Sequence, residues 1–251
     1  MSKKNTALLG ILLAAFLLVL AILAATIGLG WFSDSTEASA AGMQVSARGN
    51  LEIRAESGGK NIAVSQPSAD MKHFGGGDVK ELRPGAAGSF TFYVYSPAAE
   101  SYRFSYTLSV VNNSFYDSEE GFYAGVSQER KDQAMQMVNA HLLLFKEKSG
   151  DGVYSGWIPS AAAVETDAAT REQPVTVYWV WVPWYSDIFS DTGSLIAPED
   201  RANIADYYGS EAHRAEMFDE GEISDEGYNK ADSIIGTTLK HICFDLIVQE
   251  D

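Results

Sequence analysis

Residues 102–110 read Tyr-Arg-Phe-Ser-Tyr-Thr-Leu-Ser-Val, with apolar and polar side chains alternating along the whole stretch. Successive side chains of a β-strand point to opposite faces, so this period of two gathers the apolar residues on one face. The opposite face carries Arg103, Ser105, Thr107 and Ser109. A strand of an antiparallel sheet with one buried and one solvated side has this pattern. The stretch therefore predicts such a strand.

Other stretches alternate in the same way or are rich in β-branched and aromatic residues, which favour strands. They lie at residues 43–47, 51–53, 90–95, 141–146, 175–184 and 239–248. Together with residues 102–110 they give about seven strands, and no strand–helix–strand rhythm connects them. We therefore expect an all-β fold, an antiparallel β-sandwich of the jelly-roll or Ig-like type.

Two segments lack the strand pattern and are expected to be helical or irregular insertions, at about residues 112–139 and 186–232. Good helix formers predict a short helix over residues 128–139. Pro198 followed by two acidic residues is a plausible start for a helix over residues 198–208. The insertions are thus expected to carry helices beside the sheets.

The remaining segments are expected to be loops within one domain. Residues 57–81 are polar and rich in glycine, which favours loop structure. Residues 160–173 are rich in alanine and acidic side chains and are also predicted to be an exposed loop. Residues 31–251 as a whole are expected to form a single domain.

The N-terminal segment has the features of an export signal. Lys3 and Lys4 precede residues 7–32, an apolar run without a charged side chain. A signal peptide has a basic start followed by such a run. The run is also long enough to be an uncleaved membrane anchor, which needs about 20 apolar residues. Both interpretations leave the bulk of the chain outside the membrane, in contact with it only through this segment.

Small residues permit cleavage of the leader at two places. Cleavage between Gly30 and Trp31 would remove residues 1–30 as a signal peptide, and a second possible site lies before Ala41. A signal peptidase is then a partner during export, and the mature protein is secreted or lies at the cell surface or in the extracellular matrix. If residues 7–32 are retained, the protein is membrane-anchored instead.

The charge balance excludes several classes of function. The chain has 251 residues, 18 basic against 34 acidic side chains and a net charge of −16, which becomes −18 without residues 1–30 and their two lysines. Such a chain repels phosphate backbones, so nucleic acid is not an expected partner. One cysteine and four histidines exclude a disulfide scaffold and leave little material for a metal centre. The hydrophobic content of 46% is too high for a disordered acidic tail.

Several motifs carry a family resemblance. The leader ends Gly28-Leu29-Gly30-Trp31-Phe32-Ser33-Asp34, and Ala41-Gly42 opens the first strand. A turn at Leu82-Arg83-Pro84-Gly85 precedes Phe90-Thr91-Phe92. Farther along come the tryptophan-rich run 179–184 and Tyr228-Asn229-Lys230-Ala231-Asp232-Ser233-Ile234-Ile235-Gly236. In this order the motifs resemble those of the TasA/camelysin-like exported proteins of Gram-positive bacteria.

The resemblance implies a jelly-roll-like sandwich at the cell surface or in the biofilm matrix. It also implies that a dedicated signal peptidase removes the leader just before or within the aromatic-Ser-Asp motif. The better-known members form fibres by lending a strand to the neighbouring subunit, and some members have been described as metalloproteases. The insertions make this chain longer than the typical fibre subunit.

The sequence lacks the motifs of the common hydrolases. The zinc-protease motif His-Glu-x-x-His is absent, and the nearest stretch, His213-Arg214-Ala215-Glu216, has no second histidine. Gly-x-Ser-x-Gly and phosphate-binding loops are absent as well. Cys243 has His241 two residues away, but a cysteine on a strand is more often a small packed residue. We therefore expect no enzymatic activity, with a metal-dependent hydrolase as the weakest alternative.

The densest group of acidic side chains lies between residues 216 and 226. Its members are Glu216, Asp219, Glu220, Glu222, Asp225 and Glu226. Oxygen ligands at this density can bind Ca²⁺, although the spacing does not match an EF-hand loop. A solvated acidic loop is the simpler interpretation, and a calcium site is the alternative. Asp117, Glu119 and Glu120 form a weaker group that is open to the same two interpretations.

Three tryptophans lie in one predicted strand. Trp179 and Trp181 share a face, and Trp184 follows after Pro183. Exposed indoles would suggest a site for carbohydrate. Both faces of the strand are apolar, however, so it is expected to be central in its sheet or covered on both sides. Core packing is therefore the main interpretation, with a sugar site or a subunit contact as alternatives.

The first predicted strand is the main candidate for function. Its apolar residues are Met43, Val45, Ala47, Leu51 and Ile53. Once the leader is cleaved, a strand near a free terminus can add to an exposed sheet edge of another subunit. The alternative is that it pairs within its own domain. We therefore expect an exported, non-enzymatic surface or matrix protein that self-associates through this strand, with a surface carbohydrate- or ligand-binding module as the alternative.

Overall fold

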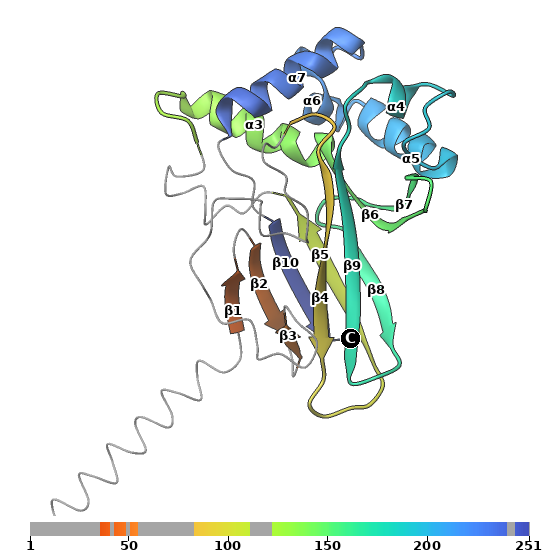
Figure 1. Cartoon of the computed structure of the whole chain (residues 1–251). Helices are drawn as coiled ribbons and strands as arrows, with labels where there is room; N and C mark the ends of the chain where they lie inside the picture. The colour runs from red at the N-terminus through yellow and green to blue at the C-terminus, as the bar shows by residue number, and fades with distance from the viewer. Residues whose placement is uncertain are drawn as a thin grey trace, which may run out of the picture. The chain divides into compact units, whose positions relative to one another are not determined.

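The computed structural model describes residues 36–40, 43–48, 51–54, 83–110, 122–239 and 244–250 (Figure 1). The chain divides into two units, Met1–Thr36 and Glu37–Asp251, and the elements below belong to the second except for Thr36 itself. The leader with Gly30 and Trp31 lies outside the described residues. Within the described ranges, every helix is too short or too polar to span a bilayer.

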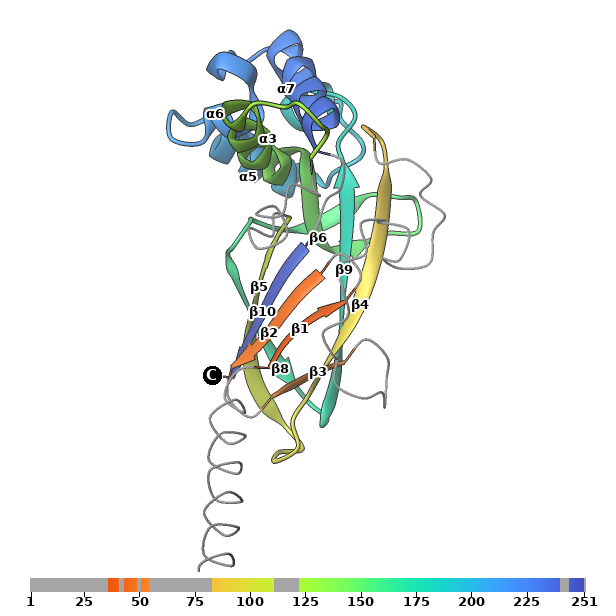
Figure 2. The same ribbon diagram turned by 90° about the vertical axis from the view of Figure 1, so that its left-hand side faces the viewer.

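The described strands form two five-stranded sheets, seen in Figures 1 and 2. The first sheet has the order β1 (Thr36–Ala40), β2 (Met43–Arg48), β10 (Phe244–Glu250), β5 (Tyr102–Ser109) and β8 (Ala163–Ala168). The second has the order β3 (Glu52–Arg54), β4 (Ala87–Tyr95), β9 (Glu172–Trp181), β6 (Leu142–Lys148) and β7 (Tyr154–Ile158). Strand β2 runs parallel to β10, and the other pairings with assigned register are antiparallel. The prediction of a β-rich, mostly antiparallel fold is thus confirmed.

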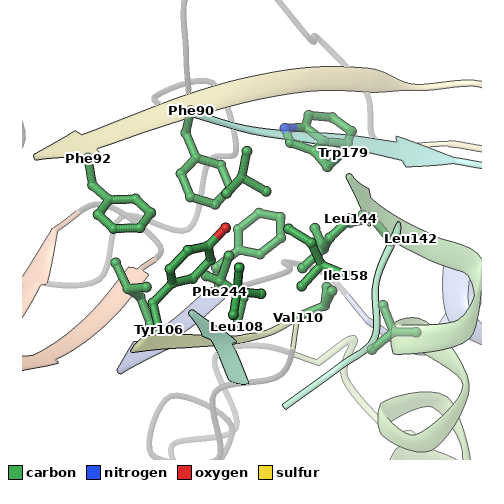
Figure 3. Close-up of a cluster of buried hydrophobic side chains, with 14 of the residues drawn as sticks. Phe90, Phe92, Tyr106, Leu108, Val110, Leu142, Leu144, Ile158, Trp179 and Phe244 are labelled. Carbon is green, nitrogen blue, oxygen red and sulfur yellow. The ribbon is translucent and has the colours of Figure 1, made fainter. Parts of the chain in front are cut away.

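The two sheets face each other across one apolar layer, which we call the inter-sheet core. Figure 3 shows Phe90 and Phe92 of β4 pointing toward Tyr106 of β5 and Phe244 of β10. The ring centroids of Phe90 and Phe244 are 5.2 Å apart, and those of Phe92 and Tyr106 are 5.6 Å apart. The alternating pattern of residues 102–110 is confirmed, because Phe104, Tyr106, Leu108 and Val110 are all buried in this core. Contact between aromatic rings of opposite sheets therefore holds the sheets together.

In the part of the chain that the structure describes, five α-helices and one short 3₁₀ helix lie at one end of the sheets (Figures 1 and 2). They are α3 (Gln128–His141), α4 (Ser186–Phe189), α5 (Pro198–Gly209), α6 (Arg214–Met217), η2 (Asp219–Gly221) and α7 (Asp225–Thr238). Serine caps begin the two longest: Ser127 accepts the backbone N–H of Arg130, and Ser224 accepts that of Gly227. We call these elements the helical layer. The predicted helices over residues 128–139 and 198–208 correspond to α3 and α5.

The second sheet is buried on both faces around β6 and β9. Val177 and Trp179 of β9 point into the inter-sheet core, and Val180 lies on the opposite face. That opposite face and the helical layer enclose a second apolar cluster, the outer core. Its buried members are Ala140, Leu143, Phe145, Tyr154, Val180, Val182, Ile188, Ile196, Ile204, Tyr208, Met217, Phe218 and Tyr228. Residues 175–184 were predicted to form a strand that is central in its sheet or covered on both sides, and β9 is both.

The prediction of a loop over residues 160–173 is wrong. Strand β8 occupies the middle of this segment, and β9 begins at Glu172. Strand β8 pairs with β5 and buries Val164 and Ala168, while Glu165 stays on the exposed side. Alanine and acidic residues have low strand propensity, but pairing with a neighbour overrides that preference. Charged side chains are also normal on an edge strand, where they prevent further pairing.

The predicted boundaries near the C-terminus also differ from the structure. The insertion was expected to end at residue 232 and the last strand to begin at Leu239. Instead, α7 continues to Thr238, and β10 is described from Phe244. The apolar residues Ile234 and Ile235 lie on the buried side of this helix, in the inter-sheet core. The last two turns of α7 therefore close one end of that core.

Candidate functional site

The first candidate site is the N-terminal arm, which we define as the described residues between 36 and 54. Strand β2 of the arm pairs in parallel with β10, near the other end of the chain. Met43, Val45 and Ala47 are in register with Phe244, Leu246 and Val248, respectively, and those three β10 residues are buried. A parallel pair cannot be joined by a tight turn. Backbone hydrogen bonds to β10 therefore hold β2 in place, and no short turn of the chain links the two strands.

The arm changes sheets immediately after β2. Strand β3 belongs to the second sheet and pairs with β4, with Ile53 in register with Val94. Leu51 and Ile53 are 5% exposed and belong to the inter-sheet core. The arm thus supplies an edge strand to each sheet, β1 to the first and β3 to the second, and places two apolar side chains between the sheets.

Arg54 fixes the end of the arm. Its guanidinium contacts Glu52 at 2.8 Å and Glu172 of β9 at 3.2 Å. It also lies 3.6 Å from the ring centroid of Tyr95 of β4. All three charged side chains are only partly exposed, so this arrangement is stronger than a surface ion pair. Arg54 therefore ties β3 to its neighbour β4 and to β9, the next strand of the sheet.

The opposite edges of both sheets carry features that prevent strand addition. Strand β8 exposes acidic side chains, including Asp167, which pairs with Arg103 at 2.9 Å. Strand β7 is covered by the segment before α5, since the backbone of Tyr154 is bonded to that of Leu195 and Ala197. Charge and coverage both protect an edge from pairing with another chain. The side of the sheets that holds the arm is therefore the better place for a strand to be exchanged.

The second candidate site is a buried group of polar side chains that we call the polar junction. His141, at the end of α3, contacts Asp232 of α7 through Nδ1 at 2.7 Å. Its Nε2 lies 2.9 Å from the carbonyl oxygen of Met217 in α6. The indole N–H of Trp181 in β9 donates to the same Asp232 oxygen at 2.6 Å. The side chains of His141 and Asp232 are 0% and 8% exposed, so three helices and one strand meet at a dry polar contact.

Tyr228 covers the polar junction on one side. Its ring stacks on that of His141 with centroids 4.3 Å apart, and its hydroxyl donates to the carbonyl oxygen of Val182 at 2.8 Å. Burial, and then the negative charges of Asp232 and Asp187, raise the pKa of Tyr228 well above its usual value. The phenol therefore stays protonated and acts as a hydrogen-bond donor.

Sequence reasoning did not single out the polar junction. His141 appeared only as the first residue of a buried strand, and Asp232 only as part of a family-like segment. A usable signal existed, because Asp232 lies between the apolar residues Ala231 and Ile234 on a helix face that is otherwise buried. A carboxylate in such a place needs a hydrogen-bond partner. Trp181 and His141 were the available donors.

The three tryptophans predicted as a possible ligand contact have different environments. Trp179 is 0% exposed and Trp181 is 2% exposed, so neither offers a ring face to a sugar. Trp179 packs so closely on Gly88 that an added Cβ there would lie 2.6 Å from the indole. Trp184 is 63% exposed. The first two tryptophans are core residues, and Trp184 alone of the three is available for a contact.

The six acidic residues predicted as a possible calcium site do not converge. Glu216 contacts His213 at 2.9 Å, Asp219 accepts a hydrogen bond from Gln133 at 3.0 Å, and Glu226 pairs with Lys230 at 3.1 Å. Among the described residues, which include all six, no group of three His, Cys, Asp or Glu side chains could hold a metal ion. The geometry therefore gives the calcium hypothesis no support.

Several other predicted residues lie outside the described part of the chain. They are Gly30 and Trp31 of the cleavage site, His241 and Cys243, and the weaker acidic group Asp117, Glu119 and Glu120. The chain matches no family model, no curated protein and no solved structure in the comparisons. The resemblance to the TasA/camelysin-like proteins thus stays a prediction from the motifs.

Proposed function

We propose that this chain is an exported, non-enzymatic protein of the cell surface or extracellular matrix that self-associates through its N-terminal arm. The observation that carries the proposal is the parallel pairing of β2 with β10. A strand that has no tight turn to its neighbour can leave and be replaced by the same strand of a second copy. The protected edges at β7 and β8 favour exchange at the arm.

The charge and the leader support the proposed location. The apolar run at residues 7–32 is typical of an export signal, and the net charge of −16 keeps a secreted protein soluble. We also propose that the two sheets are a jelly-roll or Ig-like sandwich. Both sheets pair strands that are distant in sequence, such as β4 with β9 and β5 with β10, as Greek-key sandwiches do.

A disulfide between β2 and β10 would test arm exchange directly. Ser46 and Ile247 are in register, so cysteines at these positions lie close enough to bond. The variant Ser46→Cys/Ile247→Cys also carries Cys243→Ser, to remove the natural thiol. Oxidation of the monomer should bond the arm to its own β10 and prevent assembly. Oxidation after assembly under reducing conditions should instead yield covalent oligomers on a denaturing gel.

A matched control uses a cross-strand pair that does not involve the arm. Thr91 and Thr176 are in register on β4 and β9, and their hydroxyl oxygens are 2.8 Å apart on the exposed side. Cysteines at these two positions should bond within one chain before and after assembly. If the Ser46/Ile247 pair also bonds only within one chain in material that has assembled, exchange of the arm is excluded.

A further inference from the structure

The hydrogen bonds of the polar junction fix the number of protons that it holds. The ring of His141 faces an oxygen on each side, Asp232 Oδ1 at Nδ1 and the Met217 carbonyl at Nε2. A carbonyl oxygen only accepts, so Nε2 carries a hydrogen. A second hydrogen must lie between Nδ1 and Oδ1 for that 2.7 Å contact to be a hydrogen bond. The pair therefore holds one proton more than a neutral histidine beside an ionised aspartate.

The surroundings indicate where that extra proton lies. Trp181 donates its indole hydrogen to the same Oδ1 at 2.6 Å, which stabilises negative charge on the carboxylate. The hydroxyl hydrogen of Tyr228 is directed at Val182 and is not available to His141. Asp187 of α4 acts on Tyr228 and adds negative charge to the region. The arrangement is thus an imidazolium at His141 paired with a carboxylate at Asp232.

We propose that this proton is a pH-sensitive lock that holds α6 and α7 on the second sheet. Without it, a neutral His141 ring has one hydrogen for two oxygens, so either Nε2 faces the Met217 carbonyl or Nδ1 faces the Asp232 carboxylate with a lone pair, in a site that excludes water. Two acceptors at that distance repel each other, and a buried polar group without a partner is costly. One of the two contacts must then open, which releases either the Met217 carbonyl of α6 or Asp232 of α7. The inter-sheet core has no such requirement, so raising the pH should free these helices before the sheets open.

The chain contains a natural comparison for this lock. His213 pairs with Glu216 through Nδ1 at 2.9 Å and stacks on Tyr207 with centroids 3.9 Å apart. The side chains of His213 and Glu216 are 34% and 26% exposed, so water can replace either partner. Loss of the His213 proton therefore leaves no unsatisfied group. Only the buried pair should couple its proton to the position of a helix.

Two measurements on the full chain test the lock. The nitrogen chemical shifts of the histidine rings, measured by NMR, should show both ring nitrogens of His141 protonated at neutral pH. Hydrogen exchange followed by mass spectrometry should then show that the equilibrium constant for opening of residues 214–239 rises about tenfold per pH unit, because opening releases one proton. Strands β4, β5 and β9 should remain protected over that range. A neutral His141 ring at neutral pH, or simultaneous opening of helices and strands, would overturn the proposal.

The variant Asp232→Asn tests the effect of the proton separately from the effect of side-chain packing. After a small rotation, the amide can donate to Nδ1 of His141 while its oxygen still accepts from Trp181, so a neutral histidine satisfies every contact. The pH-dependent opening should disappear in Asp232→Asn and persist in the control His213→Gln. An unchanged pH dependence in Asp232→Asn would contradict the lock. The ring measurement on the unmodified chain decides the question if the variant fails to fold.

Discussion

The inter-sheet core and the outer core are built by different means. The inter-sheet core joins long strands whose apolar side chains alternate, and its contacts are aliphatic and aromatic. The outer core lies under short helices, of which α4 and α6 have four residues each. Helices this short are not stable alone. The helical layer therefore depends on specific bonds to the sheet, such as those of the polar junction.

The two regions also differ in their charge. Residues 186–226 contain 12 acidic and 2 basic side chains, so this segment holds most of the net charge of −16. Like charges repel and oppose a compact arrangement. This difference indicates that hydrophobic burial is the main stabilising factor in the sheets. The helical layer must instead be held in place against repulsion among its acidic side chains. The helical layer should accordingly be the first region to open.

The largest effect is expected from removing one buried ring in each core. Phe104 and Phe218 are both 0% exposed, in the inter-sheet and outer core respectively. Each Phe→Ala change should cost about 3–5 kcal/mol through lost burial and a cavity. Phe104→Ala should lower the stability of the whole domain. Phe218→Ala should mainly reduce the hydrogen-exchange protection of residues 186–238, and equal loss in both regions would show that the two cores unfold together.

A smaller effect is expected at the contact between α5 and β7. The carboxylate of Asp200 accepts the backbone N–H of Gly156 at 2.8 Å and that of Trp157 at 3.0 Å. Asp200→Ala leaves both donors without this acceptor and should cost about 1–3 kcal/mol. Asp200→Asn keeps one acceptor oxygen and should cost less. Thermal unfolding of the two variants measures the difference, and equal stability of Asp200→Ala and the unchanged chain would contradict this contribution.

Alternation made the sheets predictable. In β5 the pattern alone identified the strand, its buried face and its place in an antiparallel sheet, but not its neighbours β10 and β8. Strand β8 was missed because its sequence, Ala-Val-Glu-Thr-Asp-Ala, has little strand propensity and is held by pairing with β5. Propensity describes a segment by itself, whereas an edge strand depends on its neighbour.

The candidate sites were predictable to different degrees. The strands of the arm were predicted from their apolar pattern, but the change of the arm from one sheet to the other was not, and its role in assembly stays a prediction. The polar junction joins residues that are far apart in sequence, since 91 positions separate His141 from Asp232. No local pattern contains that contact. Only the packing of α3, α6 and α7 on β9 brings these groups together.

Alkaline titration should distinguish the tyrosines of the inter-sheet core. Burial raises the pKa of Tyr106 to about 12 from its ordinary value of 10.0. The unfolded chain ionises first, so this residue contributes stability that is complete below pH 10 and is lost as the pH rises through 12. Near-ultraviolet absorbance should show one fewer late-ionising tyrosine in Tyr106→Phe. If Tyr106 ionises with the exposed tyrosines, its ring is not buried between the sheets.

The smallest effect is expected from salt, and it bears directly on the contrast in charge. Repulsion among the exposed acidic side chains of residues 186–226 is screened at distances beyond about 8 Å in 0.15 M salt. Sodium chloride should therefore stabilise the helical layer by roughly 0.5–1 kcal/mol, while the inter-sheet core changes little. Hydrogen exchange measured in low and moderate salt reports both regions in one experiment.

A neutralising variant shows whether that response comes from repulsion. Glu211 is exposed and lies between α5 and α6, so Glu211→Gln removes one charge from the acidic segment without removing a packed group. It should raise the protection of the helical layer in low salt and weaken its salt dependence. Glu165→Gln on the exposed side of β8 is the matched control, and it should alter neither quantity in the helical layer. If both variants respond alike, the total charge of the chain governs the salt response, and the local density of acidic side chains in residues 186–226 does not.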